Sequence, residues 1–461
     1  MSPQKDAFDV AVVGGGFSGA CISYHILKSE SSKVKIGVFD PRAEIGTGVA
    51  YGDCSQRHIL NVRAKGMSID DTNPQMYNRW LEGRGVDNPA NLFTHRHLYK
   101  QYVQESLVGQ SRQSQSSLSH LQSSIVSIKK NGPQEFLLEN ASGDLFSSKA
   151  VVLALGVILA NPKNQSGPAS ALTSPWNSKA FADVSTLNSI AVVGAGLTAV
   201  DVIVEAEYAG FKGKYFVVSR HAAFPRPHLE VPLSATPELI AWANSLVARK
   251  LGLRACLREF RQQVDSGGNW YQIIDALRAP TSTIWSQWST KERRFFSKNL
   301  RWAWDIHRHQ VPSVTMEMIR KLQSEDRLEL IKGSLLESSC NGKSVTVKIK
   351  SKKTNSTLEI PVDRAFDGMG LGTNIAKSDN PLVRQMLSDG LISVDDVGLG
   401  LRASPEGRIV SGQGSIISNM FLMGPLRRGE LWESTSVPEL RVQGRIIAQE
   451  ICSLFSQATL A

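Results

Sequence analysis

The stretch DVAVVGGGFSGACISYHIL, residues 9–27, decides the fold of this chain. An apolar run passes directly into Gly14-Gly15-Gly16-Phe17-Ser18-Gly19, and apolar residues at helical spacing follow. In such a unit Gly14 permits the tight turn, Gly16 lets the backbone approach a pyrophosphate, and Gly19 lets the helix pack closely on the strand. The helix N-terminus would offer free N–H groups and a positive dipole to phosphates. The stretch therefore predicts a dinucleotide-binding unit.

A second apolar run, KVKIGVFD, completes this unit and ends at Asp40. The acid lies about twenty residues past the glycines, where a carboxylate can accept the hydroxyls of a ribose. Pro41 follows it directly, and we expect Phe17, Ser18 and Pro41 to contribute to the same site. Strand, glycines, helix, strand and terminal acid together are a much stronger signal than glycines alone.

The same pattern recurs at SIAVVGAGLTAVDVIVEAEYAGFKGKYFVVSRH, residues 189–221. Gly194 and Gly196 take the first two glycine positions, and Leu197 and Thr198 begin the predicted helix. The second strand ends in Ser219-Arg220-His221 and not in an acid. No carboxylate would then repel a 2′-phosphate, and the Arg220 guanidinium could pair with it in a bidentate way. The other interpretation of Arg220 is a solvated charge at a strand end.

Two dinucleotide sites in one chain indicate that one holds a flavin and the other a hydride donor. Asp40 suits the unphosphorylated ribose of FAD, so we assign FAD to the first site and NADPH to the second. The predicted fold class is α/β, with two Rossmann-like dinucleotide-binding domains and the NADP domain inserted into a discontinuous FAD domain. The expected division is 1–165, first part of the FAD-binding domain; 166–325, NAD(P)-binding domain with a helical insertion; 326–461, C-terminal part of the FAD-binding domain. A buried strand ending in Gly156 and a returning strand at residues 417–425 suggest these limits.

The amino-acid composition limits which classes of protein and which partners are possible. The chain has 461 residues, 41% of them hydrophobic and 20% charged, and no apolar run long enough to span a membrane, so we expect a cytoplasmic protein. Five scattered cysteines without a C-x-x-C pair disfavour a structural zinc site, a disulfide framework and a dithiol redox enzyme, and we expect no metal. The net charge of +10 fits anionic small molecules at least as well as nucleic acid. We expect neither a nucleic acid nor a membrane as partner, and whether the chain forms a homo-oligomer stays open.

The segment GTGVAYGDCSQRHILNVRAKGMS, residues 46–68, carries a resemblance, as do SPWNSKAF, GAGLTAVD, VVSRHAAFPRPH, RWAWDIHRH and GLGLRASPEGRI. In this order they resemble the bacterial FAD/NAD(P)-binding flavoproteins of two-dinucleotide-domain type. More distantly, the chain is similar to flavin-dependent N-hydroxylating and Baeyer–Villiger monooxygenases. The resemblance implies that Gly14, Gly16, Ser18, Gly19 and Asp40 hold the ADP half of FAD. It implies that the following residues approach the isoalloxazine or ribityl group: His58, Leu60, Asn61 and Met67.

One stretch departs from the pattern of these relatives. They usually have a C-T-G-P-type strand end in the C-terminal half, where this chain has FDGMGLGTN, residues 366–374. The sequence leaves open how Asp367 to Gly372 meets the cofactors, and the difference could mark another substrate entrance.

The stretch GPLRRGELWEST, residues 424–435, is expected to form the second wall of the flavin site. The resemblance implies that Gly424 closes over the flavin. A helix beginning after Thr435 would stabilise negative charge on the reduced ring. Trp432 could shield the flavin. Arg427 and Arg428 could hold an anionic substrate or the nicotinamide phosphates, or they could lie in a solvated turn.

Two further groups keep two interpretations each. In NLRWAWDIHRHQ, residues 299–310, His307 and Arg308 could line the substrate or nicotinamide pocket, or could lie on a partly solvated helix face. Arg96 could contact the FAD phosphate or ribityl group, or form a structural salt bridge. The candidate catalytic residues are Asn61, His307, Arg308 and Arg428.

The resemblance implies an NADPH- and FAD-dependent monooxygenase that uses dioxygen and N-hydroxylates an amine or amino acid through a flavin C4a-hydroperoxide. The alternative is an NAD(P)H-dependent flavin reductase or dehydrogenase that passes electrons to a quinone or other acceptor. A third class, a regulatory protein that keeps FAD without turnover, would have no need of a second dinucleotide site.

Overall fold

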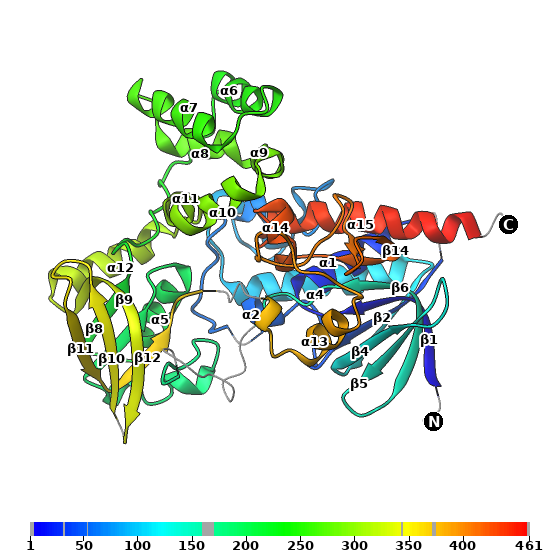
Figure 1. The fold of residues 1–461 in the computed structure, drawn as a ribbon, viewed down its shortest axis with the longest axis horizontal. Coiled ribbons are helices and arrows are strands. Elements are labelled where there is room, and N and C mark those ends of the chain that lie inside the picture. Colours follow the sequence, from blue (N-terminus) through cyan, green and yellow to red (C-terminus); the bar gives the residue numbers. More distant parts are fainter. Residues whose placement is uncertain are drawn as a thin grey trace.

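The chain forms two sheet domains and a helical projection (Figure 1). The computed structural model describes residues 4–30, 33–52, 54–158, 170–342, 344–370 and 375–458. Within them, one sheet of eight strands and one of six carry the two glycine-rich turns. None of the described helices combines the length and the apolarity that crossing a membrane requires.

The first sheet has the order β13-β14-β6-β1-β2-β3, with β4 and β5 paired antiparallel beside it. Its strands are β1 (Gln4–Val13), β2 (Lys35–Asp40), β3 (Ser117–Gln122), β4 (Ile125–Lys130), β5 (Phe136–Asn140), β6 (Leu145–Leu153), β13 (Arg408–Val410) and β14 (Ile416–Leu422). Side chains of β1 pack alternately into two apolar cores, Val10 and Val12 into one and Ala11 and Val13 into the other. A strand buried on both faces needs a continuous apolar run, and this explains the sequence signal.

Helices cover both faces of this sheet. The core around Val10 is closed by α1, α4 and α15, and the core around Ala11 receives α13 (Figure 1). The helices of this domain are α1 (Phe17–Lys28), α2 (Gly48–Tyr51), α3 (Met76–Glu82), α4 (Arg96–Gln113), α13 (Pro381–Ser388), α14 (Arg428–Leu431) and α15 (Val437–Ala458).

The second sheet has the order β11-β10-β9-β8-β7-β12. Its strands are β7 (Ser189–Val193), β8 (Lys214–Ser219), β9 (Leu328–Asn341), β10 (Ser344–Ser351), β11 (Thr357–Val362) and β12 (Arg364–Asp367). Two helices contribute to its core, α5 (Leu197–Tyr208) and α12 (Ser313–Ser324).

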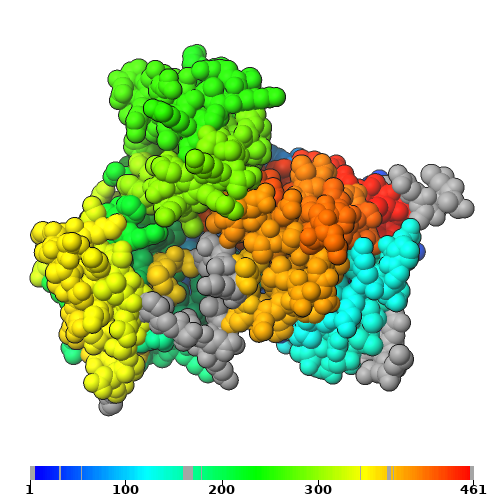
Figure 2. Space-filling view, viewed as in Figure 1, coloured from blue at the N-terminus to red at the C-terminus, as the bar shows by residue number. Residues whose placement is uncertain are grey.

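An insert of six helices separates β8 from α12 and projects from the body of the molecule (Figures 1 and 2). It comprises α6 (Pro237–Ala248), α7 (Leu253–Asp265), α8 (Trp270–Arg278), α9 (Thr281–Gln287), α10 (Thr290–Asn299) and α11 (Arg301–Arg308). The insert rests on the first domain through α14, whose residues pack against α9.

Strand pairing corrects the expected division of the chain. β9 pairs in parallel with β8, and β12 pairs in parallel with β7. The boundary expected after residue 325 is therefore wrong, because β9 to β12 complete the second sheet and the chain returns to the first domain only after Asp367. The second neighbour of β7 is β12, which lies far along the chain. No local pattern in the sequence could therefore indicate this pairing. The boundary expected at 165/166 lies outside the described residues.

Close packing at Gly19 predicts the effect of one added methyl group. A Cβ at Gly19 would lie 1.9 Å from the carbonyl oxygen of Gly14, so Gly19→Ala must push α1 away from β1. We expect it to lower the free energy of unfolding by about 2 kcal/mol or more. Thermal unfolding followed by circular dichroism measures this.

Gly109→Ala is the matched control, because Gly109 also lies in a helix, α4, but a Cβ there meets nothing within 4 Å. It should raise the stability by about 0.5–1 kcal/mol. Equal stability of the two variants would contradict the tight contact between α1 and β1.

Candidate functional site

The first glycine-rich turn joins β1 to α1 at the carboxyl edge of the first sheet. Gly14 has φ of +107°, and a Cβ there would lie 2.3 Å from the carbonyl oxygen of Ala154. A Cβ on Gly16 would lie 3.3 Å from Cα of Gly48. Gly16 precedes α1 without a side-chain cap, and the first helical turn contains no acidic residue. Free N–H groups and the positive end of the helix dipole therefore remain for a phosphate.

Asp40 lies beside this turn at the end of β2. Its carboxylate is 4% exposed, with Oδ2 accepting the N–H of Gly15 at 2.7 Å and Oδ1 accepting the N–H of Arg42 at 2.9 Å. Each carboxylate oxygen has a further lone pair. Asp40 can therefore hold the turn and still accept a hydroxyl of an unphosphorylated ribose, so its chemistry fits FAD.

β14 brings the C-terminal segment to the same edge. It pairs in parallel with β6, so Gly424 follows the strand end next to the turn. Gly424 has φ of +98°, and a Cβ there would lie 2.9 Å from Oγ of Ser18. Its N–H donates to Oε1 of Gln443 at 3.1 Å. The structure thus brings Gly424 and Ser18 together, although they lie at opposite ends of the sequence.

The second glycine-rich turn has the same geometry. Gly194 has φ of +117°, and a Cβ there would lie 2.0 Å from the carbonyl oxygen of Gly368. Gly196 is exposed, and a Cβ there meets nothing within 4 Å, which leaves space for a pyrophosphate. Gly196 also precedes α5 without a side-chain cap or an acid in the first turn. Asp367 to Gly370, the described part of the departing stretch, lies beside this turn; Leu371 to Asn374 fall outside the described residues.

Basic side chains gather around the carboxyl end of β8. Arg220 is exposed directly after β8, and β9 runs parallel to β8 and carries Lys332, whose carbonyl accepts the N–H of Lys352 at 2.9 Å. His221 stacks on Trp302 with ring centroids 4.1 Å apart. Burial and the positive charges of Lys352, Arg220 and Lys332 lower the pKa of His221. This concentration of charge fits a 2′-phosphate.

One ion pair and one histidine–carboxylate contact join the two sheet domains. Nη2 of Arg96, on α4, lies 3.0 and 2.9 Å from the two carboxylate oxygens of Asp201, on α5. Nε2 of His58 lies 3.3 Å from Oε2 of Glu205, and burial lowers the pKa of His58. Arg96, Asp201, His58 and Thr198 line a cavity of about 160 Å³. Arg96 thus forms the interdomain salt bridge, one of its two predicted roles.

A larger polar cavity lies where the insert, the first domain and the N-terminus of α15 meet, and we call it the interdomain chamber. Its volume is about 240 Å³. Nε2 of His228 donates to the carbonyl oxygen of Asn61 at 2.9 Å across it, and burial lowers the pKa of His228 to about 4. The polar and charged lining residues are Asn61, Arg63, Lys65, His228, Ser234, Tyr271, Asp275, Arg278, Arg308, His309, Gln310 and Ser436.

Two arginines give the chamber its strongest positive charge. The charge of Arg308, followed by burial, lowers the pKa of Arg278. Arg308 is 8% exposed, and its Nη2 lies 2.9 Å from Oε1 of Glu439 and 3.6 Å from Oε2 of Glu433. The expected solvated helix face is therefore wrong for Arg308, because acidic groups from the C-terminal segment hold it inside.

The arginine pair of GPLRRGELWEST is buried, so the interpretation as a solvated turn is wrong. Nη2 of Arg427 donates to the carbonyl oxygens of Ser404 and Pro405, at 3.0 and 2.8 Å, and Arg427 is 1% exposed. Burial lowers the pKa of both Arg427 and Arg428 to about 10. Arg428 lies over the ring of Trp432 and 3.9 Å from Oδ1 of Asp305. Arg427 thus holds a loop of the first domain, and Arg428 faces α11.

Trp432 turns toward the insert. Its backbone has φ of +61°, and its indole packs against Trp285 with ring centroids 4.7 Å apart and against Phe296 at 5.1 Å. Nearby, Nε1 of Trp304 donates to Oε1 of Glu433 at 2.8 Å. Helices α9 to α11 therefore face Trp432 and Glu433, near one end of the 424–435 segment. Gly424, at the other end, meets the first glycine-rich turn. This placement argues against Trp432 as a shield of the flavin.

The other residues predicted to bind a cofactor lie at several different places in the two domains. Phe17, Leu60 and Met67 lie in the first core, Gly156 follows β6 with φ of +64°, and Leu197 begins α5. Pro41 and Thr435 are exposed, and Oγ of Ser219 accepts the N–H of Ala222 at 2.9 Å. α15 begins at Val437, and the hydroxyl of Ser436 pairs with the carboxylate of Glu439.

Lys332, Lys352 and Arg278 had no signal in the sequence analysis, because each comes from an element distant in sequence from the motif it joins. Arg63 and His228 lie in stretches that carry the resemblance but were not singled out. One signal was present and unused. Six of the nine tryptophans lie between residues 242 and 304, which marks the insert as an aromatic unit.

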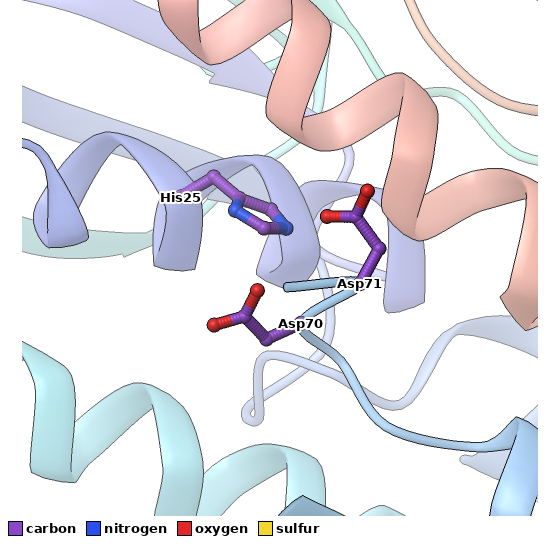
Figure 3. A group of neighbouring side chains, drawn as sticks. All are labelled: His25, Asp70 and Asp71. Carbon is purple, nitrogen blue, oxygen red and sulfur yellow. The ribbon is translucent and has the colours of Figure 1, made fainter. Parts of the chain in front are cut away.

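A buried polar cluster joins α1 to α15 (Figure 3). His25, Asp70 and Asp71 offer ligand atoms within 4.8 Å of one another. Nζ of Lys28 lies 2.6 Å from Oδ2 of Asp70, and Nε of Arg445 lies 2.8 Å from Oδ2 of Asp71. Burial lowers the pKa of His25 to about 4. Since both carboxylates already have cationic partners, the cluster is explained as a link between helices.

Known proteins share this architecture. Residues 11–158 match the family model described as FAD-NAD(P)-binding. The ornithine N-hydroxylase of Kutzneria sp. 744 has a TM-score of 0.68 at 14% identity, covering 97% of this chain and 99% of that one. The cadaverine monooxygenase of desferrioxamine biosynthesis from Erwinia amylovora scores 0.66 at 11% identity, covering 98% and 95%. The bacillithiol disulfide reductase of Bacillus cereus scores 0.57 at 13% identity, covering 97% and 99%.

No curated protein sequence matches the chain. The structural similarities confirm the predicted α/β fold with two dinucleotide-binding domains, and the family match over residues 11–158 supports the resemblance inferred from residues 46–68 and the other quoted stretches. The chain has the fold of two-dinucleotide-domain flavoproteins.

The basic group beyond β8 leads to a prediction about cofactor choice. Arg220→Ala should weaken the binding of NADPH by about tenfold to a hundredfold, because a charge-assisted bond to the 2′-phosphate is lost. It should leave the binding of NADH almost unchanged. Steady-state KM values for the two nucleotides measure the difference. Arg254→Ala removes the charge of another exposed arginine, on α7, and should change neither KM value. An equal loss for NADPH and NADH in Arg220→Ala would contradict this assignment.

Proposed function

We propose that the protein is an NADPH- and FAD-dependent monooxygenase that N-hydroxylates an amine. One observation carries the proposal: two glycine-rich turns, each followed by a helix without a side-chain cap, belong to domains that meet around polar cavities. One turn adjoins Asp40, which suits an unphosphorylated ribose, and the other adjoins Arg220, Lys332 and Lys352. The fold similarity to an ornithine N-hydroxylase and a cadaverine monooxygenase supports the same reaction class.

Residues of the first domain would hold FAD. The N–H groups at the start of α1 would bind the pyrophosphate, and Asp40 would accept the ribose hydroxyls. When bound, FAD supplies hydride acceptance and oxygen activation. Asn61 and Ser436 line the chamber toward which the α15 N-terminus is directed, so the helix dipole and Arg308 would stabilise negative charge there.

Residues of the second domain would hold NADPH. The start of α5 would bind its pyrophosphate, where Gly196 leaves open space, and the basic group would bind its 2′-phosphate. The salt bridge between Arg96 and Asp201 fixes α4 against α5 and so fixes the distance between the two sites. The overall reaction converts R–NH₂, dioxygen, NADPH and a proton into R–NHOH, water and NADP⁺.

The second candidate is an NAD(P)H-dependent reductase, favoured by the fold similarity to a bacillithiol disulfide reductase. All five cysteines are free. Cys54 lines the cavity of about 160 Å³, but burial raises the pKa of its thiol, which disfavours the reactive thiolate. A reductase that delivers electrons to a quinone or another acceptor would not need a thiol.

Coupled turnover distinguishes the two candidates. The FAD-loaded protein, NADPH and a panel of amines and amino acids should give at least one substrate for which hydroxylamine formation and oxygen consumption both follow NADPH oxidation. A reaction without amine is the control and should release hydrogen peroxide instead. NADPH oxidation that proceeds equally fast without oxygen when a quinone is added, with no hydroxylamine from any amine, would contradict the monooxygenase and favour the reductase.

A further inference from the structure

Residues of the helical insert line a cavity with a volume of about 410 Å³. Its walls come from α6 to α11 in the projection seen at the top of Figures 1 and 2, and Trp432 of the first domain closes it. Small-molecule binding sites commonly have volumes in this range. Neither dinucleotide site accounts for this cavity.

The lining of this insert cavity contains no Asp, Glu, Lys or Arg side chain. Five tryptophans of the insert, aliphatic residues and one phenylalanine from each of α7 and α10 provide most of the surface. The lining residues are Trp242, Leu246, Leu253, Cys256, Leu257, Phe260, Val264, Trp270, Ile274, Leu277, Thr281, Ile284, Trp285, Trp288, Phe296, Leu300, Ala303, Trp304, His307 and Trp432.

Several polar atoms of this lining already bind the protein itself. Nε1 of Trp285 donates to the carbonyl oxygen of Gly429 at 2.8 Å, and Oγ1 of Thr281 donates to that of Leu277 at 2.5 Å. The indole N–H groups of Trp288 and Trp304 are also bonded to protein acceptors. The cavity therefore offers a ligand mainly apolar contact.

His307 provides a hydrogen-bond acceptor in this surface. Its Nδ1 lies 2.7 Å from the carbonyl oxygen of Ala303, so Nδ1 carries the proton and donates. In this tautomer Nε2 keeps a lone pair. The ring of Trp270 meets the imidazole edge to face at 4.8 Å and fixes its orientation. A ligand with one N–H or O–H donor can bind here.

The insert cavity adjoins the interdomain chamber. Ile274 lines both, and the consecutive residues His307 and Arg308 line one each. A ligand whose apolar body fills the insert cavity can thus present a polar end toward the chamber where the flavin would react.

We propose that the insert cavity binds the body of the substrate, and that the substrate is a hydrophobic amine with an aromatic or branched aliphatic body. This inference rests on the proposed monooxygenase function. A zwitterionic amino acid such as ornithine or lysine does not suit the cavity, because its carboxylate and ammonium would lose water without gaining a charged partner. The positive charges of Arg278 and Arg308 next door disfavour an ammonium and favour the neutral amine, the form whose nitrogen lone pair can accept oxygen.

Calorimetric titration of the FAD-loaded protein with NADP⁺ tests the proposal without turnover. Tryptamine and 2-phenylethylamine are the apolar probes, and L-lysine is the polar one. We expect the apolar amines to bind at least about tenfold more tightly than L-lysine, as burial of one aromatic side chain predicts. Similar affinities for the three probes, or no binding of either aromatic amine, would overturn the substrate class.

Variants locate the binding site. Leu257→Trp on α7 and Ala303→Phe on α11 fill the cavity from two sides. Each should weaken the binding of tryptamine at least about tenfold. Arg254→Trp places the same indole on the exposed face of α7 and should leave the affinity unchanged. Unchanged binding in either folded filling variant, checked by circular dichroism, would place the amine elsewhere and overturn the proposal. If one variant does not fold, the other variant and the comparison of the three probes still test whether the amine binds in the insert cavity.

The two proposals can fail separately. Tight tryptamine binding that both filling variants abolish, without hydroxylamine formation in the wild type, would support the apolar site and contradict the monooxygenase. Hydroxylamine formed from lysine or ornithine, with weak binding of the aromatic amines, would support the monooxygenase and overturn the hydrophobic substrate.

Discussion

The contact between the backbones of Gly14 and Gly19 is the constraint on which the first domain depends. Only a hydrogen at Gly19 lets α1 approach β1, and this approach aims the N-terminus of α1 at the carboxyl edge of the sheet. Because β6 and β14 run parallel to β1, their ends reach the same edge. The second domain has Ala199 at the position of Gly19, and its close backbone contact is that of Gly194 with Gly368. Both sites are thus consequences of close backbone packing.

The C-terminal segment connects these sites to the insert. Gly424 contacts Ser18 beside the first turn, whereas Glu433 receives Trp304 and Arg308 from α11. Removing one partner from such a buried charge group leaves the other uncompensated, which makes the connection specific. The same short segment therefore lines both spaces, the apolar cavity through Trp432 and the positively charged chamber through Ser436.

The sequence predicted what local spacing encodes: both βαβ units, the acid at Asp40, the exposed Arg220 and the return through Gly424. It did not predict contacts that depend on topology. β12 joins β7 from far along the chain, and this moved the boundary expected at residue 325. The burial of Arg427 depends on backbone carbonyls of a distant loop, and Trp432 turns to the insert through a left-handed backbone that favours glycine elsewhere. The clustered tryptophans indicate an aromatic unit in the sequence, but their arrangement around a cavity depends on the packing of six helices.

The central claim is that the two dinucleotide sites serve oxygen activation, and the reaction of the reduced flavin with oxygen tests it most directly. The protein is reduced with NADPH under nitrogen, mixed with aerated buffer in a stopped-flow instrument, and followed by flavin absorbance. The account predicts an oxygenated flavin that persists before the oxidised spectrum returns, since the basic lining of the interdomain chamber should stabilise it. Direct return to oxidised flavin with stoichiometric hydrogen peroxide, with and without tryptamine, would contradict the account.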